Sequence, residues 1–100
     1  MARKPNTNKQ GGSWTDAQKL SVWRKGKRVN DKSSLTWRKD KCGNEIKWSE
    51  YGNRNSNYGW EIDHITAVAN GGSDYLSNLQ PLHWKNNASK ADKRYWRCPN

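Results

Sequence analysis

The sequence has very few aliphatic side chains for its length but is rich in tryptophan. Its 100 residues include only 11 Leu, Ile and Val and no Phe, but seven Trp and four Tyr. A charged chain so poor in aliphatic residues is usually interpreted as disordered. However, each buried Trp removes roughly 200 Å² from water, and apolar burial contributes about 25 cal/mol per Å². We therefore expect one small, loop-rich domain with a core of indole rings.

The charge of the chain is distributed unevenly. The net charge is +10, yet residues 55–84 contain three acidic residues and no Lys or Arg. Basic residues dominate on both sides of this segment. Such a chain is attracted to a polyanion while one acidic region stays free to bind a cation. The alternative is that the basic residues only keep the surface soluble.

Neither a membrane span nor an export signal is visible. No apolar run approaches the roughly 20 residues that cross a bilayer, and residues 1–12 lack a hydrophobic stretch. We therefore expect a cytoplasmic protein without membrane contact. Cys42 and Cys98 can form one disulfide, although reduced thiols are more common without an export signal, so their redox state stays open. The paired CxxC motifs of a zinc knuckle are absent.

The chain divides into a short arm and a domain. Residues 1–12 are polar and basic and end in a Gly pair, which is typical of a disordered arm. Residues 13–100 form the single domain. Its first element is a short helix, because Thr15 and Gln18 have the spacing of a capping box and Gly26 ends the helical run.

The remaining elements follow from composition and periodicity. Residues 29–59 are rich in Asn, Ser, Gly and Lys, which predicts irregular structure with short strands. Residues 60–66 alternate apolar and polar side chains, as in a strand. A second strand at 79–82 has to be short and at an edge because it contains Pro81. Residues 83–93 lack Gly and Pro and are predicted to be helical.

Polar residues recur in a fixed order between residues 59 and 93. The sequence contains DH at 63–64, NGG at 70–72, NLQ at 78–80 and NxxK at 87–90. This order and spacing resemble the HNH nucleases, whose motif is a two-stranded ribbon and a helix around one metal ion. Residues 38–53 also resemble small stand-alone bacterial and phage members. The resemblance implies an α+β fold: a small, loop-rich domain with a ββα-metal (HNH) motif and an additional N-terminal helix.

The resemblance implies a role for each residue of this pattern. Asp63 and Asn87 hold the metal, and His64 acts as the general base. Asn78 ties down the loop between the strands and supports the base, and Lys90 stabilises the charged phosphate. An imidazole with a pKa of about 6.5 suits a base at neutral pH. Carboxylate and amide oxygens are hard ligands, so Mg²⁺ or Mn²⁺ completed by water suits this set better than Zn²⁺.

Several alternatives stay open at these positions. Asn87 can be a solvated helix residue, and Lys90 can point to solvent. His83 lies four residues before Asn87 and shares its helix face, so it can be an additional ligand, a phosphate contact or a packing residue. Family members with a zinc knuckle have Cys at the positions of His83 and Asn86, and this chain has neither, which favours packing or a phosphate contact. Ala67 stands where relatives often have Pro, which leaves the loop shape in doubt.

The resemblance implies a DNA substrate that is held through its phosphates. The expected nucleic-acid-binding residues are Arg24, Lys25, Lys27, Arg28, Lys85, Lys93, Arg94 and Arg97. No base-reading module is visible in the sequence.

The expected activity is hydrolysis of DNA phosphodiester bonds with the help of a divalent metal. The enzyme would nick double-stranded DNA and leave 5′-phosphate and 3′-hydroxyl ends. One site makes one cut, so a double-strand break needs a dimer or two events, and the oligomeric state is not determined by the sequence. A larger protein partner, such as phage packaging or restriction machinery, is compatible with the resemblance. The alternatives are a non-catalytic DNA-binding or assembly module and an RNase.

Overall fold

In the computed structural model, which describes residues 3–99, regular structure begins with a capped helix. Thr15 accepts a hydrogen bond from the Gln18 amide, and the Gln18 side chain accepts one from the Thr15 amide, as the capping box predicts. The helix α1 spans Asp16–Trp23 and buries Val22 and Trp23. It is shorter than the segment up to Gly26, because Arg24 already serves as its C-terminal cap.

The middle of the chain forms a small antiparallel sheet. Its strands are β1 (Lys27–Arg28), β2 (Trp37–Lys39) and β3 (Glu45–Lys47), and β2 lies in the centre. A short 3-10 helix, Trp48–Glu50, follows β3. The prediction of irregular structure with short strands is therefore confirmed.

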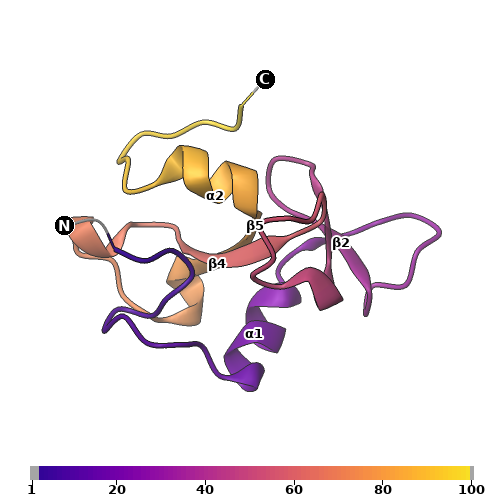
Figure 1. Cartoon of the computed structure of the whole chain (residues 1–100), viewed down its shortest axis with the longest axis horizontal. Coiled ribbons are helices and arrows are strands. Elements are labelled where there is room, and N and C mark those ends of the chain that lie inside the picture. Colours follow the sequence, from indigo (N-terminus) through magenta and orange to yellow (C-terminus); the bar gives the residue numbers. More distant parts are fainter. Residues whose placement is uncertain (1–2, 100) are drawn as a thin grey trace.

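A strand hairpin and a helix follow (Figure 1). The strands β4 (Trp60–His64) and β5 (Leu79–His83) pair antiparallel over their whole length, and the helix α2 (Trp84–Lys90) begins directly after β5. Short 3-10 helices at Val68–Asn70 and Leu76–Asn78 interrupt the loop between the strands. Pro81 in β5 has no N–H to donate, and since the sheet has only two strands, no third strand needs this donor. The structure confirms the predicted α+β fold with a ββα motif and an additional N-terminal helix.

The core is built around indole rings. Trp23 and Trp60 are 1% and 0% exposed, and their ring centroids lie 5.1 Å apart. Trp48 and Tyr51 pack on Trp60 at 5.7 and 5.0 Å. Offset and edge-to-face contacts of this kind suit aromatic quadrupoles. The few aliphatic core residues, such as Ile46, fill the space between these rings. This packing holds α1, the three-stranded sheet and β4 together.

The buried carboxylate of Asp40 joins the first sheet to the start of α2. One of its oxygens accepts hydrogen bonds from the backbone amides of Cys42 and Asn44, and the other accepts from the His83 amide and the Asn86 side chain. Four donors compensate for the loss of water around a charge that is 1% exposed. The position of α2 is therefore set by polar contacts as well as by packing.

The C-terminal segment is attached by a disulfide between Cys42 and Cys98. The two cysteines are 56 positions apart in the sequence. The expectation that they are reduced thiols therefore does not hold in this structure. None of the helices within residues 3–99 has the length and hydropathy needed to cross a membrane.

The N-terminal arm follows a defined path, in contrast to the predicted disorder of residues 1–12. Asn6 accepts hydrogen bonds from the Ile62 amide at 2.8 Å and from the Tyr51 hydroxyl at 3.1 Å, so the arm lies along the free edge of β4 (Figure 1). Arg3 donates to backbone carbonyls of the arm itself. Apart from the Tyr51–Asn6 bond, these bonds join polar side chains to backbone groups, and composition alone does not reveal them. Residues 1 and 2 lie outside the described part.

Candidate active site

A cavity of about 400 Å³ lies between the end of β4, α2 and the N-terminal arm. Asp63 and His64 of β4 and Asn87 of α2 line it together. The arm contributes residues 3–7 to the opposite wall. The structure thus brings three of the predicted site residues to one cavity, although they are separated by up to 24 positions in the sequence.

The end of β4 allows Asp63 and His64 to reach the same cavity. Consecutive strand residues point to opposite faces of a sheet, and the two side chains do contact different partners. Asp63 contacts Lys90 of α2, whereas His64 contacts Trp14 and Asp74. The regular strand ends at His64, and both Asp63 and His64 line the cavity.

Asp63 is a buried carboxylate with two partners. Gln80, its register partner on β5, donates to Oδ2 at 2.8 Å, and Lys90 Nζ lies 3.2 Å from Oδ1. The residue is 5% exposed. Burial raises the pKa of Asp63, while the Gln80 hydrogen bond and the Lys90 charge oppose this rise. These two partners hold the carboxylate at the cavity wall and favour its ionised form.

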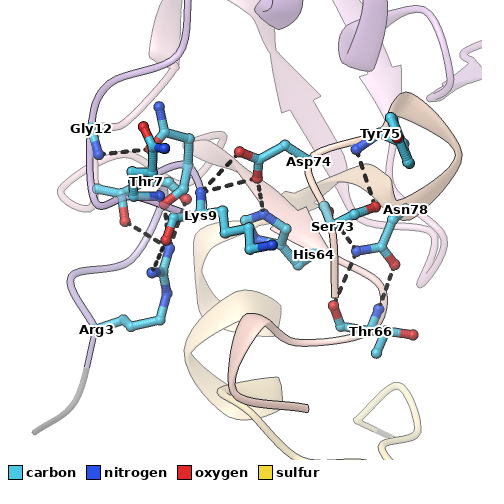
Figure 2. A network of polar contacts seen from close by, with 12 residues as sticks. Arg3, Thr7, Lys9, Gly12, His64, Thr66, Ser73, Asp74, Tyr75 and Asn78 are labelled. Atoms are coloured by element: carbon cyan, nitrogen blue, oxygen red, sulfur yellow. Dashed lines mark hydrogen bonds and ion pairs between the residues drawn. The ribbon is translucent and has the colours of Figure 1, made fainter. Parts of the chain in front are cut away.

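His64 is positioned on two sides. Its Nε2 lies 2.7 Å from Oδ1 of Asp74, and its ring packs against Trp14 with a centroid distance of 5.6 Å. Figure 2 shows the imidazole next to the Asp74 carboxylate. Asp74 comes from the loop between β4 and β5 and also accepts hydrogen bonds from the Lys9 amide. The imidazole is therefore held by Trp14 and by the loop, and the arm in turn holds the loop through Asp74.

Asn87 contacts an ion pair whose carboxylate is buried and whose Arg54 side chain is exposed and lines the cavity. Its Nδ2 donates to Glu61 at 2.8 Å, and Glu61 binds Arg54 through two hydrogen bonds of 2.8 Å. The hydrogen bond to Glu61 raises the pKa of Arg54. Since Nδ2 is engaged, Oδ1 is the Asn87 atom available to a cation. The neighbouring Asn86 points elsewhere, to Asp40, which agrees with its different position around the helix.

Asn78 closes the loop between the two strands. Its side chain accepts a hydrogen bond from the Thr66 amide and donates to the carbonyls of Thr66 and Ser73 (Figure 2). Its backbone carbonyl accepts a further bond from Ile65. Gly72 lies so close to Thr66 that a Cβ would be 1.7 Å from the Thr66 oxygen. These contacts connect the residues after His64 to the start of β5.

Lys90 and His83 have structural partners. Lys90 is 5% exposed, which excludes the solvent-exposed alternative, and its Nζ donates to the His64 carbonyl at 2.8 Å. His83 caps α2: Nδ1 accepts from the Lys85 amide, and Nε2 lies 2.7 Å from the Asn57 carbonyl. Both ring nitrogens are therefore engaged, and His83 packs at the helix start.

The predicted nucleic-acid-binding residues lie mainly on exposed positions. Four of them lie directly after α1 and on β1, namely Arg24, Lys25, Lys27 and Arg28, and four lie on α2 and the C-terminal segment, namely Lys85, Lys93, Arg94 and Arg97. The ammonium of Lys25 is already bound by the carbonyls of Leu76 and Leu79. The cations that line the cavity are Arg3, Lys4 and Arg54.

Two kinds of site residue were not identified from the sequence. Asp74 contacts His64, and the only sequence signal for it was that residues 55–84 contain just three acidic residues. The arm residues were interpreted as disordered, although they form one wall of the cavity. Their contacts depend on the path of the chain, and local pattern carries no information about them.

The oxygen donors at the cavity are few. Within residues 3–99 no group of three or more His, Cys, Asp and Glu side chains is arranged to hold a metal ion. The carboxylate of Asp63 and Oδ1 of Asn87 remain as donors at the same cavity. Two hard oxygen donors fit Mg²⁺ or Mn²⁺, which keep several waters, and do not fit a structural Zn²⁺ site.

Comparison with known proteins supports the interpretation of the motif. Neither the curated proteins nor the solved structures give a match to the chain. The family model described as HNH endonuclease matches residues 40–93, which include β3, β4, β5 and α2 and more than half of the chain. The protein therefore belongs to the HNH endonuclease family, whose members are nucleases with nucleic-acid substrates.

Proposed function

We propose that the protein is a divalent-metal-dependent endonuclease that nicks double-stranded DNA and leaves 5′-phosphate and 3′-hydroxyl ends. The observation that carries this proposal is the common cavity of Asp63, His64 and Asn87 in a chain of the HNH family. Each side chain supplies what phosphodiester hydrolysis needs: a base for water, and oxygen donors for a cation next to the phosphate.

In this proposal, His64 accepts a proton from a water molecule in the cavity. The water oxygen forms a bond to phosphorus while the bond between phosphorus and the 3′-oxygen breaks. The released 3′-oxygen takes a proton from solvent and becomes the 3′-hydroxyl of one fragment. The phosphate stays on the 5′-oxygen of the other fragment. One cavity makes one such cut, so a monomer nicks one strand.

Asp63 and Asn87 are the residues that would hold the cation. When bound, the cation would neutralise charge on the phosphate and on the leaving oxygen. Lys90 contacts Asp63 and the His64 carbonyl and does not line the cavity, so we assign it to positioning these two residues instead of binding phosphate. Asn78 supports the loop after β4 in the same way.

The substrate would be held through its phosphates. Arg3 and Lys4 line the cavity from the arm, and further basic side chains lie on exposed positions directly after α1, on β1, on α2 and on the C-terminal segment. Contacts between such cations and phosphates release counterions, so DNA affinity should fall as the salt concentration rises. The sequence of the DNA is not expected to matter strongly, because no base-reading element is present in residues 3–99.

Conversion of supercoiled plasmid to open circles tests the proposal. The purified protein is assayed with Mg²⁺, with Mn²⁺ and with EDTA, next to the variants His64→Ala, Asp63→Asn and Asn87→Ala. Asp16→Asn is the matched control, because it removes an exposed carboxylate on α1 far from the motif in sequence. We expect nicking only with metal, and a loss of at least about 100-fold in His64→Ala, which is the lower end of what a general base contributes.

DNA binding measured by fluorescence anisotropy in EDTA separates the alternatives. The site variants should bind DNA like the wild type, and Asp16→Asn should nick like the wild type. Salt-dependent binding without nicking in any metal would favour a non-catalytic binding module. Cleavage of RNA but not of DNA would favour an RNase. Equal nicking by wild type and His64→Ala would refute the role of His64.

A further inference from the structure

The base of the proposed reaction is held by a carboxylate from another segment. Oδ1 of Asp74 lies 2.7 Å from Nε2 of His64, and both groups are shown in Figure 2. An ionised carboxylate can only accept hydrogen bonds, so the ring proton of a neutral imidazole must be on Nε2. The lone pair of His64 is then on Nδ1, which has no hydrogen-bond partner within residues 3–99.

The surroundings of Asp74 keep it ionised. Partial burial opposes ionisation, but the hydrogen bond from His64 and the one from the Lys9 amide outweigh it and lower the pKa of the Asp74 carboxyl. Trp14 packs against the imidazole from a different part of the chain. The ring of His64 therefore has little freedom to rotate or to exchange its tautomer.

The N-terminal arm holds Asp74 in place. The backbone amide of Lys9 lies 3.0 and 3.1 Å from the two oxygens of Asp74. A turn closed by a hydrogen bond from Gly11 to Asn8 contains Lys9 in its second position. Arg3 fixes the same segment, because its guanidinium donates to the carbonyls on both sides of this amide (Figure 2).

We infer that Asp74 is a positioning residue for His64, and that the Lys9 amide holds Asp74, so that the arm is part of the active site. This inference rests on the proposed function of His64 as the base. Asp74 keeps the proton on Nε2 and directs Nδ1 to the water. The arm therefore affects the rate of the chemical step, in addition to any contact it makes with DNA.

The tautomer of His64 can be measured without nuclease activity. Two-bond ¹H–¹⁵N NMR spectra at about pH 8, where an imidazole is mostly neutral, distinguish a proton on Nε2 from one on Nδ1. His83 is an internal reference, because its contacts also require a proton on Nε2. We expect the Nε2-protonated form for both histidines in the wild type. In Asp74→Ala, the Nε2-protonated fraction of His64 should fall to that of a solvated imidazole, and His83 should keep its tautomer.

Kinetics with enzyme in excess over DNA test the effect on the reaction. Asp74→Ala should lower the maximal rate by about 10- to 100-fold with little change in DNA affinity, since outer partners of site histidines contribute on this scale. Lys9→Pro removes the amide donor, and Pro fits the second position of such a turn. Lys9→Ala is its matched control, because it removes the same charge and keeps the amide.

We expect a lower maximal rate for Lys9→Pro than for Lys9→Ala, with equal DNA affinity. A wild-type His64 that is protonated on Nδ1 overturns the inference. An active wild type whose maximal rate is unchanged in Asp74→Ala overturns it as well. If no protein cleaves DNA but the tautomer responds to Asp74→Ala, the proposed function fails while the positioning contact stands. The side chain of Asp74 is 34% exposed, so its replacement should leave the fold intact.

Discussion

Removal of the disulfide should destabilise the protein by an amount that can be worked out from the structure. Cys42 and Cys98 are 56 residues apart in the sequence. The loop-closure model converts a loop of this length into about 4 kcal/mol of stability at 25 °C, because the crosslink restricts the unfolded chain. This is a large part of the roughly 5–15 kcal/mol that stabilises a typical domain.

The C-terminal segment makes this value an upper limit. Residues 91–99 are mostly exposed, and besides the bridge two hydrogen bonds that involve side chains hold them, one from Trp96 to Ser89 and one from Asn70 to the Asp92 carbonyl. Without the bridge, this segment can fray in the folded state, and the entropy that it gains reduces the loss of stability. We therefore expect a loss of about 2–4 kcal/mol, in the usual range for disulfides.

Urea unfolding followed by tryptophan fluorescence measures this loss. With a slope of about 2 kcal/mol per molar urea, reduction by dithiothreitol should lower the midpoint by roughly 1–2 M. The double variant Cys42→Ser/Cys98→Ser should have the lower midpoint with or without reductant. A thiol titration of the unfolded, unreduced protein checks that the bridge is present. Equal free energies of unfolding for the bridged and the reduced protein would refute the loop-closure reasoning.

Three other perturbations have expected outcomes. Gly72→Ala should cost about 1–3 kcal/mol of stability and lower nicking, because its Cβ would be 1.7 Å from the Thr66 carbonyl oxygen. Gly43→Ala has open space around the new Cβ but a φ of +85°, so it should cost about 1 kcal/mol. Urea midpoints of both variants equal to that of the wild type would contradict this. Trp60→Ala should lose about 3–5 kcal/mol, since the ring is 0% exposed at the centre of the core, and an unfolding midpoint like that of the wild type would be incompatible with the packing. Asp74 has a pKa below its ordinary 3.8, so it stabilises the fold above about pH 4, and this contribution disappears as the pH falls through the lowered value. Asp74→Asn should therefore weaken the fall of the melting temperature at acid pH. An unchanged fall would argue against the hydrogen bonds of this carboxylate.

Local signals in the sequence were sufficient for the main elements. The capping box at Thr15 predicted the first helix, and the alternation in 60–66 predicted β4. The predicted helix 83–93 exists but ends early, at Lys90, because Ala91 adopts a positive φ of 47° that a helix does not continue. The resemblance to the HNH nucleases pointed to Asp63, His64 and Asn87 as site residues, and these three line one cavity.

The remaining features needed the three-dimensional path of the chain. The arm seemed too polar to fold, but it binds the edge of β4 through Asn6 and holds Asp74 through Lys9, a residue 65 positions away. The pairing of Cys42 with Cys98 likewise depends on where the C-terminal segment meets the turn between β2 and β3.

By itself, the sequence determined the kind of core, the order of helices and strands, and the polar residues of the motif, because these depend on composition and on short-range spacing. Only the tertiary structure decided which groups position the imidazole and which side chains contact the Asp63 carboxylate. Hydrogen bonds require partners within about 3 Å, and for segments far apart in the chain this proximity arises only when the whole domain has packed.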